Sequence, residues 1–517
     1  MSASKKSSRS LAVLLFVLFL TFLDTTIVAV ALASVQSLLH AGVAQLQWVV
    51  GGYALVFAAL MLIFGKLGDK FGRRRILVVG MAVFVGGSVI SALAVNPTML
   101  ILGRGVMGLG AAASEPGTLS MLRQLYPDES QRARALGVWA AIAGLAIAVG
   151  PVFGGVLIGI GGFRALFWFN VAAGAVVTVL AFKTLPESFD VDPSGLDIKG
   201  AVTGATALAL LVVGIILGES QGYSSVVVIA LFVLGIASAA AFTFVELRAS
   251  DPLINLRYLA IPRFTVSLTT AFTVYFTIIA VFFFTALYLQ LVEGYSGYRI
   301  ALIFLPMTIG MVFASLIAGG WVARAGPRVP MTFGAIAGGA GVIAADIALG
   351  GNVHVLMLTS SLTLAGLGFG ITVVPVTFVA LSVIPARHSG MAAATTNTAR
   401  ALGVIVSVSV LGSLLNGELT NGLGRRLELL GIPANFRSIV ISAVETGSMP
   451  AGGSGGIGQI ERAYGPLVLK VISAADDAFH GGLTVALMVA GVLMLISAAV
   501  AVVGFRYENG PRESNYP

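Results

Sequence analysis

The sequence contains no cysteine, so disulfide bonds, thiolate metal sites and thiol catalysis are excluded. It has only four histidines, and their spacing is not typical of a metal site. Charged residues make up 10% of the chain, whereas about 25% is usual for a soluble domain. There is no nucleotide-binding loop of the Gly-x4-Gly-Lys-Ser/Thr type and no Ser/His/Asp constellation. We therefore expect neither an ATP-driven protein nor an enzyme.

Hydrophobic residues make up 57% of the 517 residues, and the mean hydropathy is +0.99. Apolar segments of about 20 residues follow one another, each long enough to cross a hydrocarbon core of about 30 Å. A transmembrane β-barrel would show shorter segments of alternating polarity instead. The sequence therefore predicts an all-α polytopic membrane protein. We expect fourteen transmembrane helices, at 11–33, 47–65, 76–95, 99–122, 135–158, 165–182, 200–218, 224–245, 264–290, 300–323, 330–350, 355–384, 391–415 and 481–505.

The net charge of +8 does not indicate a nucleic-acid partner, because the basic residues lie in short loops between the spans. If the N-terminus lies in the cytosol, the cytosolic loops and tails hold about three times as many Lys and Arg residues as the outer loops, which is typical of membrane topology. Both termini are therefore predicted to be cytoplasmic. Lys5, Lys6 and Arg9 precede a full-length span, which we interpret as an uncleaved anchor.

The chain repeats itself weakly. Segment 319–329 echoes segment 65–75 with the same glycine spacing, and Arg387 before the thirteenth span matches Arg132 before the fifth at nearly the same offset. Paired six-helix halves around a midplane site are typical of secondary transporters. The predicted organisation is an N-terminal half at 1–190, two inserted helices at 191–258 and a C-terminal half at 259–517.

A long outer loop is predicted at 416–480. It contains the glycine-rich stretch 451–456, which favours a flexible excursion. An amphipathic segment at 437–444 is the alternative.

Segment 65–75 is a short, highly charged connection between the second and third spans. Gly65 and Gly72 permit a tight turn, and Arg73 begins a basic cluster at the cytosolic end of the third span. Asp69 lies just past the end of the second span. We expect it to pair with a basic residue or a helix N-terminus of the other half in one conformation only, as part of a cytosolic gate.

This connection is similar to the signature of the major facilitator superfamily between its second and third helices. The resemblance implies the major facilitator fold, with two pseudo-symmetric six-helix halves and transport by alternating access. In the second copy Ala323 stands at the position of Asp69, so we expect the gate contact to be one-sided.

The fifth span carries a run of small residues whose spacing resembles the motif of antiporters within this superfamily. Glycines allow another helix to approach closely, and proline favours a kink. The residues of this predicted antiporter motif are Gly144, Gly150, Pro151, Gly154 and Gly155.

Residues 23–28 of the first span, Leu-Asp-Thr-Thr-Ile-Val, resemble the first-helix motif of the fourteen-helix drug:proton antiporter family (QacA/EmrB-like). Further matches occur at 47–48, 163–170, 252–257 and 288–290. The resemblance covers about 10–410 and the last span. It implies proton-coupled drug export across a bacterial cytoplasmic membrane.

Only three acidic residues fall within the predicted spans: Asp24, Glu115 and Asp346. A charge near the centre of a membrane helix costs roughly 2.5–3.5 kcal/mol on insertion scales, so such residues are functional candidates. A rise of about 1.5 Å per residue places Asp24 and Arg104 at similar depth. We therefore predict that Asp24 and Arg104 form a proton-sensitive contact.

Glu115 shares one face of the fourth span with Arg104, Gly108 and Ala111. We interpret this face as an open cavity lining, where Glu115 captures a cationic substrate or relays a proton. An interfacial acid that reaches water is the alternative for Glu115.

Arg400 lies in the middle of the thirteenth span and needs a partner, for which Asp346 is one candidate. A structural pair and a transport role are both open for Arg400, and a wetted interfacial acid is the alternative for Asp346. Aromatic side chains in the ninth span offer cation–π contact with a lipophilic cation, although lipid-facing packing accounts for most of them. The predicted cavity-lining residues are Tyr53, Tyr275, Tyr288, Gln290 and Asn397.

The sequence thus predicts a proton-coupled antiporter that exports amphipathic, cationic small molecules (multidrug efflux). A dedicated exporter of one compound, such as a self-made antibiotic, an amino acid or a lipid, is the first alternative, and a non-transporting membrane sensor is the second. The expected partners are lipophilic or cationic small molecules, protons and the lipid bilayer. We expect a monomer that needs no cofactor and binds no nucleic acid.

Overall fold

The computed structural model describes residues 3–39, 41, 43–189, 197–249, 252, 255–295, 297–350, 353–385, 388–432, 437 and 466–505. Every regular element within these ranges is a helix, which confirms the predicted all-α class for this part of the chain. Twelve of the described helical segments are long and apolar enough to cross a membrane, although α4 and the first part of α5 are not among them. The total of fourteen spans and the domain boundaries stay predictions.

The N-terminal half begins with five long helices: α1 Ala3–Leu39, α2 Val43–Phe71, α3 Arg73–Ala92, α4 Pro97–Leu125 and α5 Glu129–Thr184. Asp128 caps α5 by accepting hydrogen bonds from the Ser130 hydroxyl and the Gln131 N–H, which lower the pKa of its carboxyl. Helix α5 contains both the fifth and sixth predicted spans. Its backbone leaves helical geometry only at Gly161 and Gly162, where the predicted connection lies.

The inserted pair consists of α6 Ile198–Gln221 and α7 Val226–Arg248, which pack on each other. The remaining elements are η1 Leu256–Ala260, α8 Pro262–Ile279, η2 Ala280–Thr285, α9 Ala286–Leu291, α10 Gly297–Ala325, α11 Arg328–Leu349, α12 Val355–Val383, α13 Ser389–Val406, η4 Ser407–Leu411, α14 Gly412–Leu429 and α17 Pro466–Gly504.

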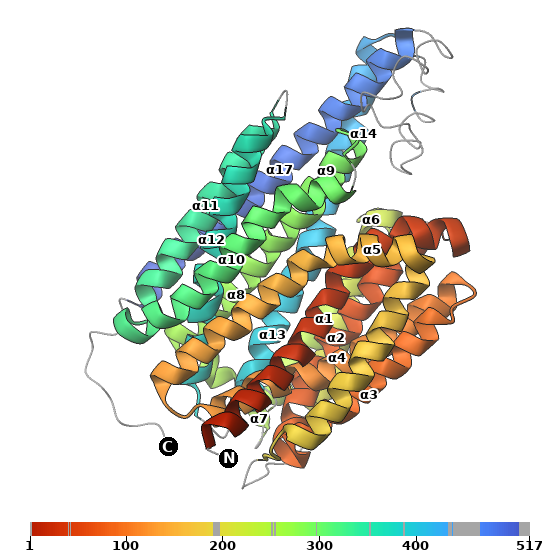
Figure 1. The fold of residues 1–517 in the computed structure, drawn as a ribbon. Coiled ribbons are helices and arrows are strands. Elements are labelled where there is room, and N and C mark those ends of the chain that lie inside the picture. Colours follow the sequence, from red (N-terminus) through yellow and green to blue (C-terminus); the bar gives the residue numbers. More distant parts are fainter. Residues whose placement is uncertain are drawn as a thin grey trace.

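The two halves form separate bundles that meet along α5 and α13. Figure 1 shows α1–α5 in red to yellow beside the green and blue C-terminal bundle, with the start of α1 and the end of α17 at the same end of the molecule. Helix α5 packs on α1 within its own half and on α10 of the other half, and α2 packs on α13. At the end where the charged loops lie, Arg123 at the end of α4 donates to the Ile384 carbonyl after α12 at 3.0 Å.

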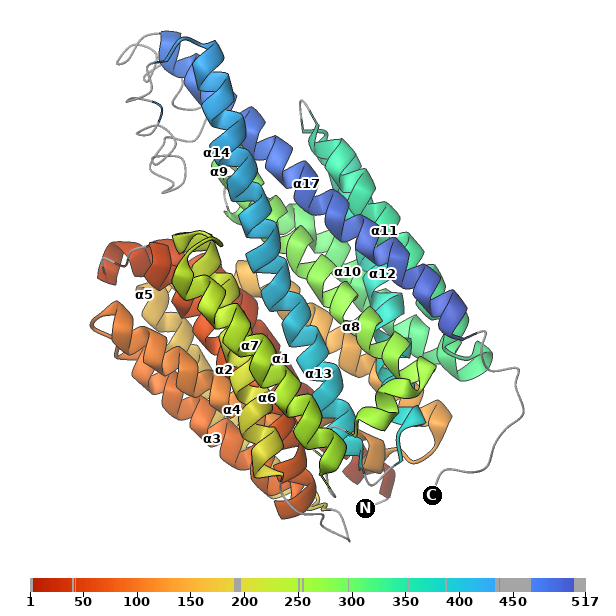
Figure 2. The same ribbon diagram turned by 180° about the vertical axis from the view of Figure 1, so that it is seen from behind.

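Helices α6 and α7 lie beside the seam between α2 and α13 (Figure 2). Ala58 of α2, Ile216 of α6 and Ala401 of α13 belong to one small apolar cluster. Helix α6 of the inserted pair therefore covers the seam with apolar side chains.

Two π-helical segments, η2 and η4, interrupt the ninth and thirteenth predicted spans and contact each other. The Ser407 hydroxyl of η4 donates to the Phe276 carbonyl at 2.7 Å, which ties η4 to α8 just before η2. A π-bulge changes the direction of the side chains that flank it and is frequent at functional sites. These two spans carry Tyr275 and Arg400.

The predicted outer loop at 416–480 is wrong at both ends. Helix α14 continues to Leu429, and α17 begins at Pro466. Arg426 and Asp477, one on each helix, form an ion pair at 3.1 Å. The glycine-rich stretch 451–456 and residues 438–444 lie outside the described residues. The apolar pattern ends at 415 in the thirteenth span and begins at 481 in the last span. Hydropathy therefore did not show that the helices continue beyond these points.

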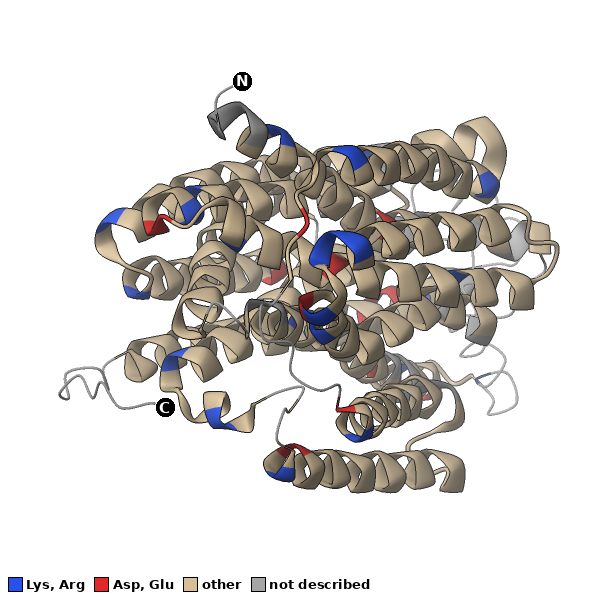
Figure 3. Cartoon of the chain, turned by 90° about the horizontal axis from the view of Figure 1, so that it is seen from below, with Lys and Arg blue, Asp and Glu red and all other residues tan. Residues whose placement is uncertain are grey.

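Figure 3 views the molecule from the end where α1 begins and α17 ends. Lys and Arg residues, in blue, mark turns and helix ends, whereas the long helix surfaces are tan. In the described part of the chain, five charged side chains within the predicted spans are buried. Asp24, Arg104, Glu115, Asp346 and Arg400 are all at least nine-tenths buried.

Candidate functional site

The N-terminal half encloses a polar network centred on Asp24 of α1. Asp24 Oδ2 accepts a hydrogen bond from Arg104 of α4, and Asp24 Oδ1 accepts one from the Asn170 amide of α5 at 2.7 Å. Arg104 Nε donates to the Val49 carbonyl of α2 at 2.9 Å, and its guanidinium carbon lies 4.4 Å from the ring centre of Tyr53. Four helices thus converge on one carboxylate.

The predicted contact between Asp24 and Arg104 is present, and the proton sensitivity of this contact stays a prediction. Both carboxylate oxygens have a partner, and neither Asp24 nor Arg104 is more than 1% exposed. The sequence did not reveal the role of Asn170. Its amide donates a hydrogen bond to Asp24. An asparagine within an apolar span was the sequence signal that could have indicated this role. Tyr53 contacts the arginine rather than an open cavity.

The second polar network lies where the two halves meet. Glu115 Oε2 of α4 accepts a hydrogen bond from the Thr21 hydroxyl at 3.0 Å, while Glu115 Oε1 has no partner. Arg400 of α13 donates to Asn397 Oδ1 at 2.7 Å and to the Thr377 hydroxyl of α12. No ion pair joins Glu115 to Arg400 among the described residues. Glu115 is 0% exposed, so the alternative of an interfacial acid that reaches water is wrong.

Aromatic rings surround the Arg400 guanidinium from both halves. Its central carbon lies 4.9 Å from the Trp139 ring of α5 and 5.4 Å from the Tyr275 ring of α8. Phe22 of α1 meets each of these rings edge to face, with centroids 6.2 Å apart. The sequence predicted Tyr275 as a lining residue but missed Trp139 and Phe22, because their proximity depends on how the halves meet.

The predicted open face of α4 between Arg104 and Glu115 is wrong. A Cβ atom at Gly108 would lie 2.5 Å from the Tyr53 carbonyl oxygen, and Ala111 is fully buried. Small residues at these positions let α2 pack closely against α4. They fill the space between the two charges with backbone and leave no cavity wall there.

Asp346 is not the partner of Arg400, which corrects that prediction. Asp346 lies on α11, accepts a hydrogen bond from Thr484 of α17 and lies close to His480. The ring of Tyr288 packs against the His480 ring with centroids 5.8 Å apart. These residues form a separate cluster within the C-terminal half. The side chain of Gln290 lies outside the described residues.

The connection between α2 and α3 contains contacts within the N-terminal half. Asp69 pairs with Arg73 of its own half at 2.6 Å. The predicted contact of Asp69 with the other half stays a prediction. Gly72 has a φ angle of 109°, which favours glycine, and a Cβ atom there would lie 2.8 Å from Glu187. Gly326 occupies the matching position between α10 and α11 with a φ angle of 75°, which supports the internal repeat. Gly65 is buried within α2.

The glycines of the predicted antiporter motif differ in what they contact. A Cβ atom at Gly150 would overlap the Thr26 hydroxyl of α1, and one at Gly154 would lie 2.9 Å from Ile27. Gly144 faces Met311 of α10, so it contacts the other half. Gly155 is exposed, with no described atom within 4 Å of an added Cβ.

The kink that we predicted at Pro151 does not interrupt the helix. Helix α5 continues through residue 151, and its break lies at Gly161 and Gly162. The side chain of Pro151 lies outside the described residues. The proline therefore sits between the two close contacts that α5 makes with α1.

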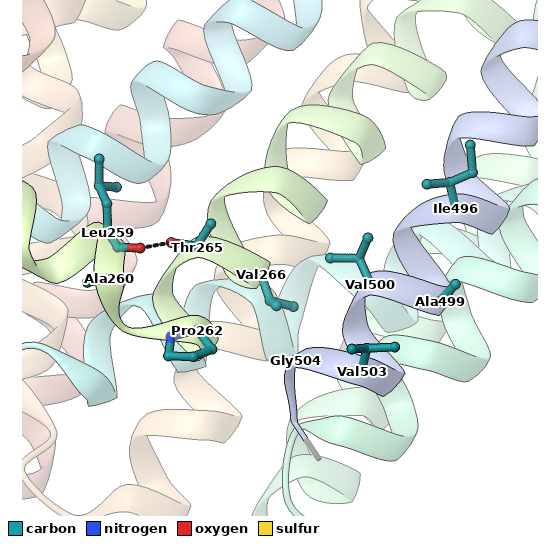
Figure 4. A pocket seen from close by; sticks show the side chains of 10 residues that line it. All are labelled: Leu259, Ala260, Pro262, Thr265, Val266, Ile496, Ala499, Val500, Val503 and Gly504. Atoms are coloured by element: carbon teal, nitrogen blue, oxygen red, sulfur yellow. Dashed lines mark hydrogen bonds between the residues drawn. The ribbon is translucent and has the colours of Figure 1, made fainter. Parts of the chain in front are cut away.

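An apolar groove of about 670 Å³ lies between α8 and the end of α17 (Figure 4). Its walls include Leu259, Pro262 and Val500, and the Thr265 hydroxyl bonds to the Leu259 carbonyl. No ionisable side chain lines the groove. It is separate from both polar networks, and we assign it no role in transport.

Known proteins resemble this chain over most of its length. The model of the Major Facilitator Superfamily matches residues 14–408. The chain is 31% identical over 490 residues to the Multidrug resistance protein Stp of Mycobacterium tuberculosis, covering 95% of this chain and 90% of Stp. It is 30% identical over 446 residues to the Methylenomycin A resistance protein of Bacillus subtilis, covering 85% of this chain and 95% of that protein.

A solved structure supports the same fold. The human organic anion transporter MFSD10 (TETRAN) has a TM-score of 0.60 and 14% identity, and the match covers 96% of this chain and 99% of that chain. At this identity the likeness concerns the fold alone. Because the family model spans well over half of the sequence and the relatives align along most of it, the chain belongs to the major facilitator superfamily of multi-pass membrane transporters.

Proposed function

We propose that the protein is a proton-coupled antiporter that exports amphipathic, cationic small molecules across a bacterial cytoplasmic membrane, with both termini in the cytosol. The observation that carries this proposal is the buried pair of Asp24 and Arg104. A carboxyl group holds its proton when it is buried alone and releases it when a cation pairs with it. A carboxylate that alternates between these surroundings binds a proton on one side of the membrane and releases it on the other.

The proton acts on the helices that hold Asp24. Asp24, Arg104 and Asn170 all belong to the N-terminal half, so a rigid rocking of the halves does not separate them. We propose that protonation of Asp24 weakens its bond to Arg104 and shifts α1. Thr26 follows Asp24 on α1 and lies against Gly150 of α5, so a shift of α1 moves α5.

Movement of α5 reaches the other half through Gly144. A Cβ atom at this glycine would lie 3.0 Å from Met311 of α10, and α5 and α10 pack along the boundary between the halves. This path connects the Asp24 network mechanically to α10 of the C-terminal half. Rocking of one half against the other around a central site is the general mechanism of this transporter class.

The relatives favour export of drugs but include proteins named for one compound. Stp is named a multidrug resistance protein, whereas the Bacillus subtilis relative is named for methylenomycin A. A dedicated exporter of one antibiotic is therefore the second candidate function. A panel of chemically unlike cations and neutral antibiotics separates the two, because a dedicated exporter confers resistance to one member only.

The direct test is uptake of a fluorescent lipophilic cation into energised inside-out vesicles. We expect uptake by the wild type that collapses with an uncoupler and is absent in Asp24→Asn. Glu129→Gln is the matched control, because the Glu129 side chain is 76% exposed and lies outside both networks. Uptake by Asp24→Asn that equals the wild type and resists the uncoupler contradicts the proposal.

A further inference from the structure

The network around Arg400 is assembled from both halves of the protein. Glu115, Phe22 and Trp139 come from α4, α1 and α5, whereas Tyr275 and Arg400 come from α8 and α13. Relative movement of the halves therefore changes the distances between these two groups of side chains. The Asp24 network lacks this property, because all of its members belong to one half.

The guanidinium of Arg400 occupies a place that suits an organic cation. It lies within about 6 Å of two aromatic rings, the range in which a cation is attracted to an aromatic face. Proteins that recognise quaternary ammonium groups use aromatic cages of this kind. Phe22 supports the Trp139 and Tyr275 rings by edge-to-face packing.

Several polar atoms at this seam are buried without a hydrogen-bond partner. They are Glu115 Oε1, the Tyr275 hydroxyl, Arg400 Nε and Asn397 Nδ2. Each belongs to a side chain that is more than nine-tenths buried. Buried polar atoms are nearly always satisfied in folded proteins, so such a cluster marks a place where another group binds in a different state.

The charges at the seam are also incompletely paired. Arg400 is held by neutral oxygens of Asn397 and Thr377 in its own half, and Glu115 is held by the Thr21 hydroxyl in the other half. The two charges are close enough to interact electrostatically but form no ion pair. A carboxyl group buried without an ionic partner favours its protonated form, and a cation that binds beside it favours the carboxylate.

We propose that Phe22, Trp139 and Tyr275 together with Glu115 form a binding site for lipophilic organic cations, which the Arg400 guanidinium occupies in this conformation. The arginine acts as an internal competitor for the transported cation. When the halves separate at this point, Arg400 leaves with the C-terminal half and exposes Trp139, Phe22 and Glu115 to cargo. When the halves close again, the guanidinium returns to the rings and displaces the cargo.

The class of cargo follows from this chemistry. A quaternary ammonium or phosphonium ion with aromatic or alkyl substituents matches the rings and the single carboxylate, and it has no hydrogen-bond donor that would need further acceptors. A dianion or a neutral sugar has no matching groups here. This assignment rests on the proposed export of cations, because it names the site at which the exported molecule binds.

Equilibrium binding of tetraphenylphosphonium to the purified full chain in lipid nanodiscs tests the proposal. We expect Arg400→Met to bind the probe roughly tenfold more tightly than the wild type, because the internal competitor is removed. Arg400→Gln keeps a hydrogen-bonding side chain without the charge and should show the same gain. Arg400→Lys keeps the charge and should bind as weakly as the wild type.

Variants of the N-terminal half should weaken binding of the probe instead. Trp139→Leu and Glu115→Gln should each weaken binding roughly tenfold, because one loses the ring face and the other the counter-charge. Trp139→Phe keeps an aromatic face and serves as the matched control. Size-exclusion profiles and thermal unfolding identify any variant that fails to fold, and Trp139→Leu against Trp139→Phe then decides by itself.

A purely structural role for Arg400 gives a different result. Neutral variants of Arg400 would then lose thermal stability and bind the probe no more tightly than the wild type, and this outcome overturns the proposal. Unchanged binding by Trp139→Leu also overturns it. Because binding is measured without a proton gradient, loss of proton-driven uptake leaves this result readable and concerns the antiport proposal alone.

Discussion

Two arginines in the centre of the bundle are both buried, yet they are held in opposite ways. Arg104 is paired with Asp24 inside one half, and that carboxylate has a partner on each oxygen. Arg400 lies between the halves among aromatic rings and neutral oxygens, without an ion pair to Glu115. The first arrangement pairs its two charges with each other, whereas the second leaves Arg400 and Glu115 without an ion pair.

This difference separates two tasks that a coupled transporter must perform. A complete charge pair within one rigid half is suited to hold or release a proton without depending on the position of the other half. An incomplete set of charges between the halves is sensitive to that position. Variants at the two networks should therefore differ in their effects on stability as well as on transport.

The largest effect is expected from breaking the complete pair. Asp24→Ala leaves Arg104 buried without its counter-ion and should lower the free energy of unfolding by about 3–5 kcal/mol. The double variant Asp24→Ala, Arg104→Met should lose less than the sum of the single losses, because no charge is left unpaired. Thermal and denaturant unfolding in detergent measure this, and strictly additive losses would show that the two side chains do not depend on each other.

A smaller effect is expected where α1, which carries Asp24, packs against α5. Gly150→Ala places a methyl group against the Thr26 hydroxyl and should lower stability by about 1–3 kcal/mol through overpacking. Gly155→Ala is the matched control on the same helix, because open space surrounds that position. Equal melting temperatures for the two variants would refute the close contact between α1 and α5.

The incomplete network should tolerate a comparable change better than the pair does. Glu115→Gln removes a carboxylate that has one neutral hydrogen-bond partner and no ion pair, so the free energy of unfolding should change by about 1 kcal/mol or less. The same unfolding assay, run beside Asp24→Asn, gives the comparison. A loss from Glu115→Gln as large as that from Asp24→Ala would place an ion pair at the seam.

The smallest effect is expected for an exposed ion pair beside the connection between α2 and α3. Arg75 lies 3.6 Å from Glu187, and its side chain is 77% exposed. Arg75→Ala should change stability by at most about 1 kcal/mol, because solvent screens this interaction. Glu187→Ala should cost more than Arg75→Ala, since Glu187 also accepts hydrogen bonds from the Arg74 and Ser188 backbone. Equal losses would mean that these backbone bonds contribute nothing.

Part of this architecture could be predicted from the sequence because it depends on local pattern. Hydropathy located the helices, the repeat predicted two related halves, and helical rise placed Asp24 and Arg104 at the same depth. The internal repeat is visible again in the left-handed backbone of Gly72 and Gly326. The predicted roles of the site residues in proton coupling, gating and substrate binding stay predictions.

Other features depend on how helices pack, which one sequence does not reveal. Spacing placed Gly108 and Ala111 between two charges and suggested an open wall, but the same small residues let α2 fill that space. Asp346 was chosen for Arg400 by charge alone, whereas neutral oxygens and rings hold the arginine instead. Trp139 and Phe22 were missed because Trp139 meets Arg400, and Phe22 meets Tyr275, only across the boundary between the halves.

The long helices α14 and α17 also have a consequence for watching the protein at work. Helix α17 has 39 residues, or about 58 Å at 1.5 Å per residue, which exceeds a hydrocarbon core of about 30 Å. Its contacts with α11 and α8 join it to the C-terminal half. Its N-terminal part packs against α14. The ends of α14 and α17 that meet at Arg426 and Asp477 therefore belong to one half, and the proposed rocking of that half would move them further than its membrane-embedded part. In a chain with no native cysteine, a single cysteine in place of the exposed Asp477 would carry a spectroscopic label that reports this movement.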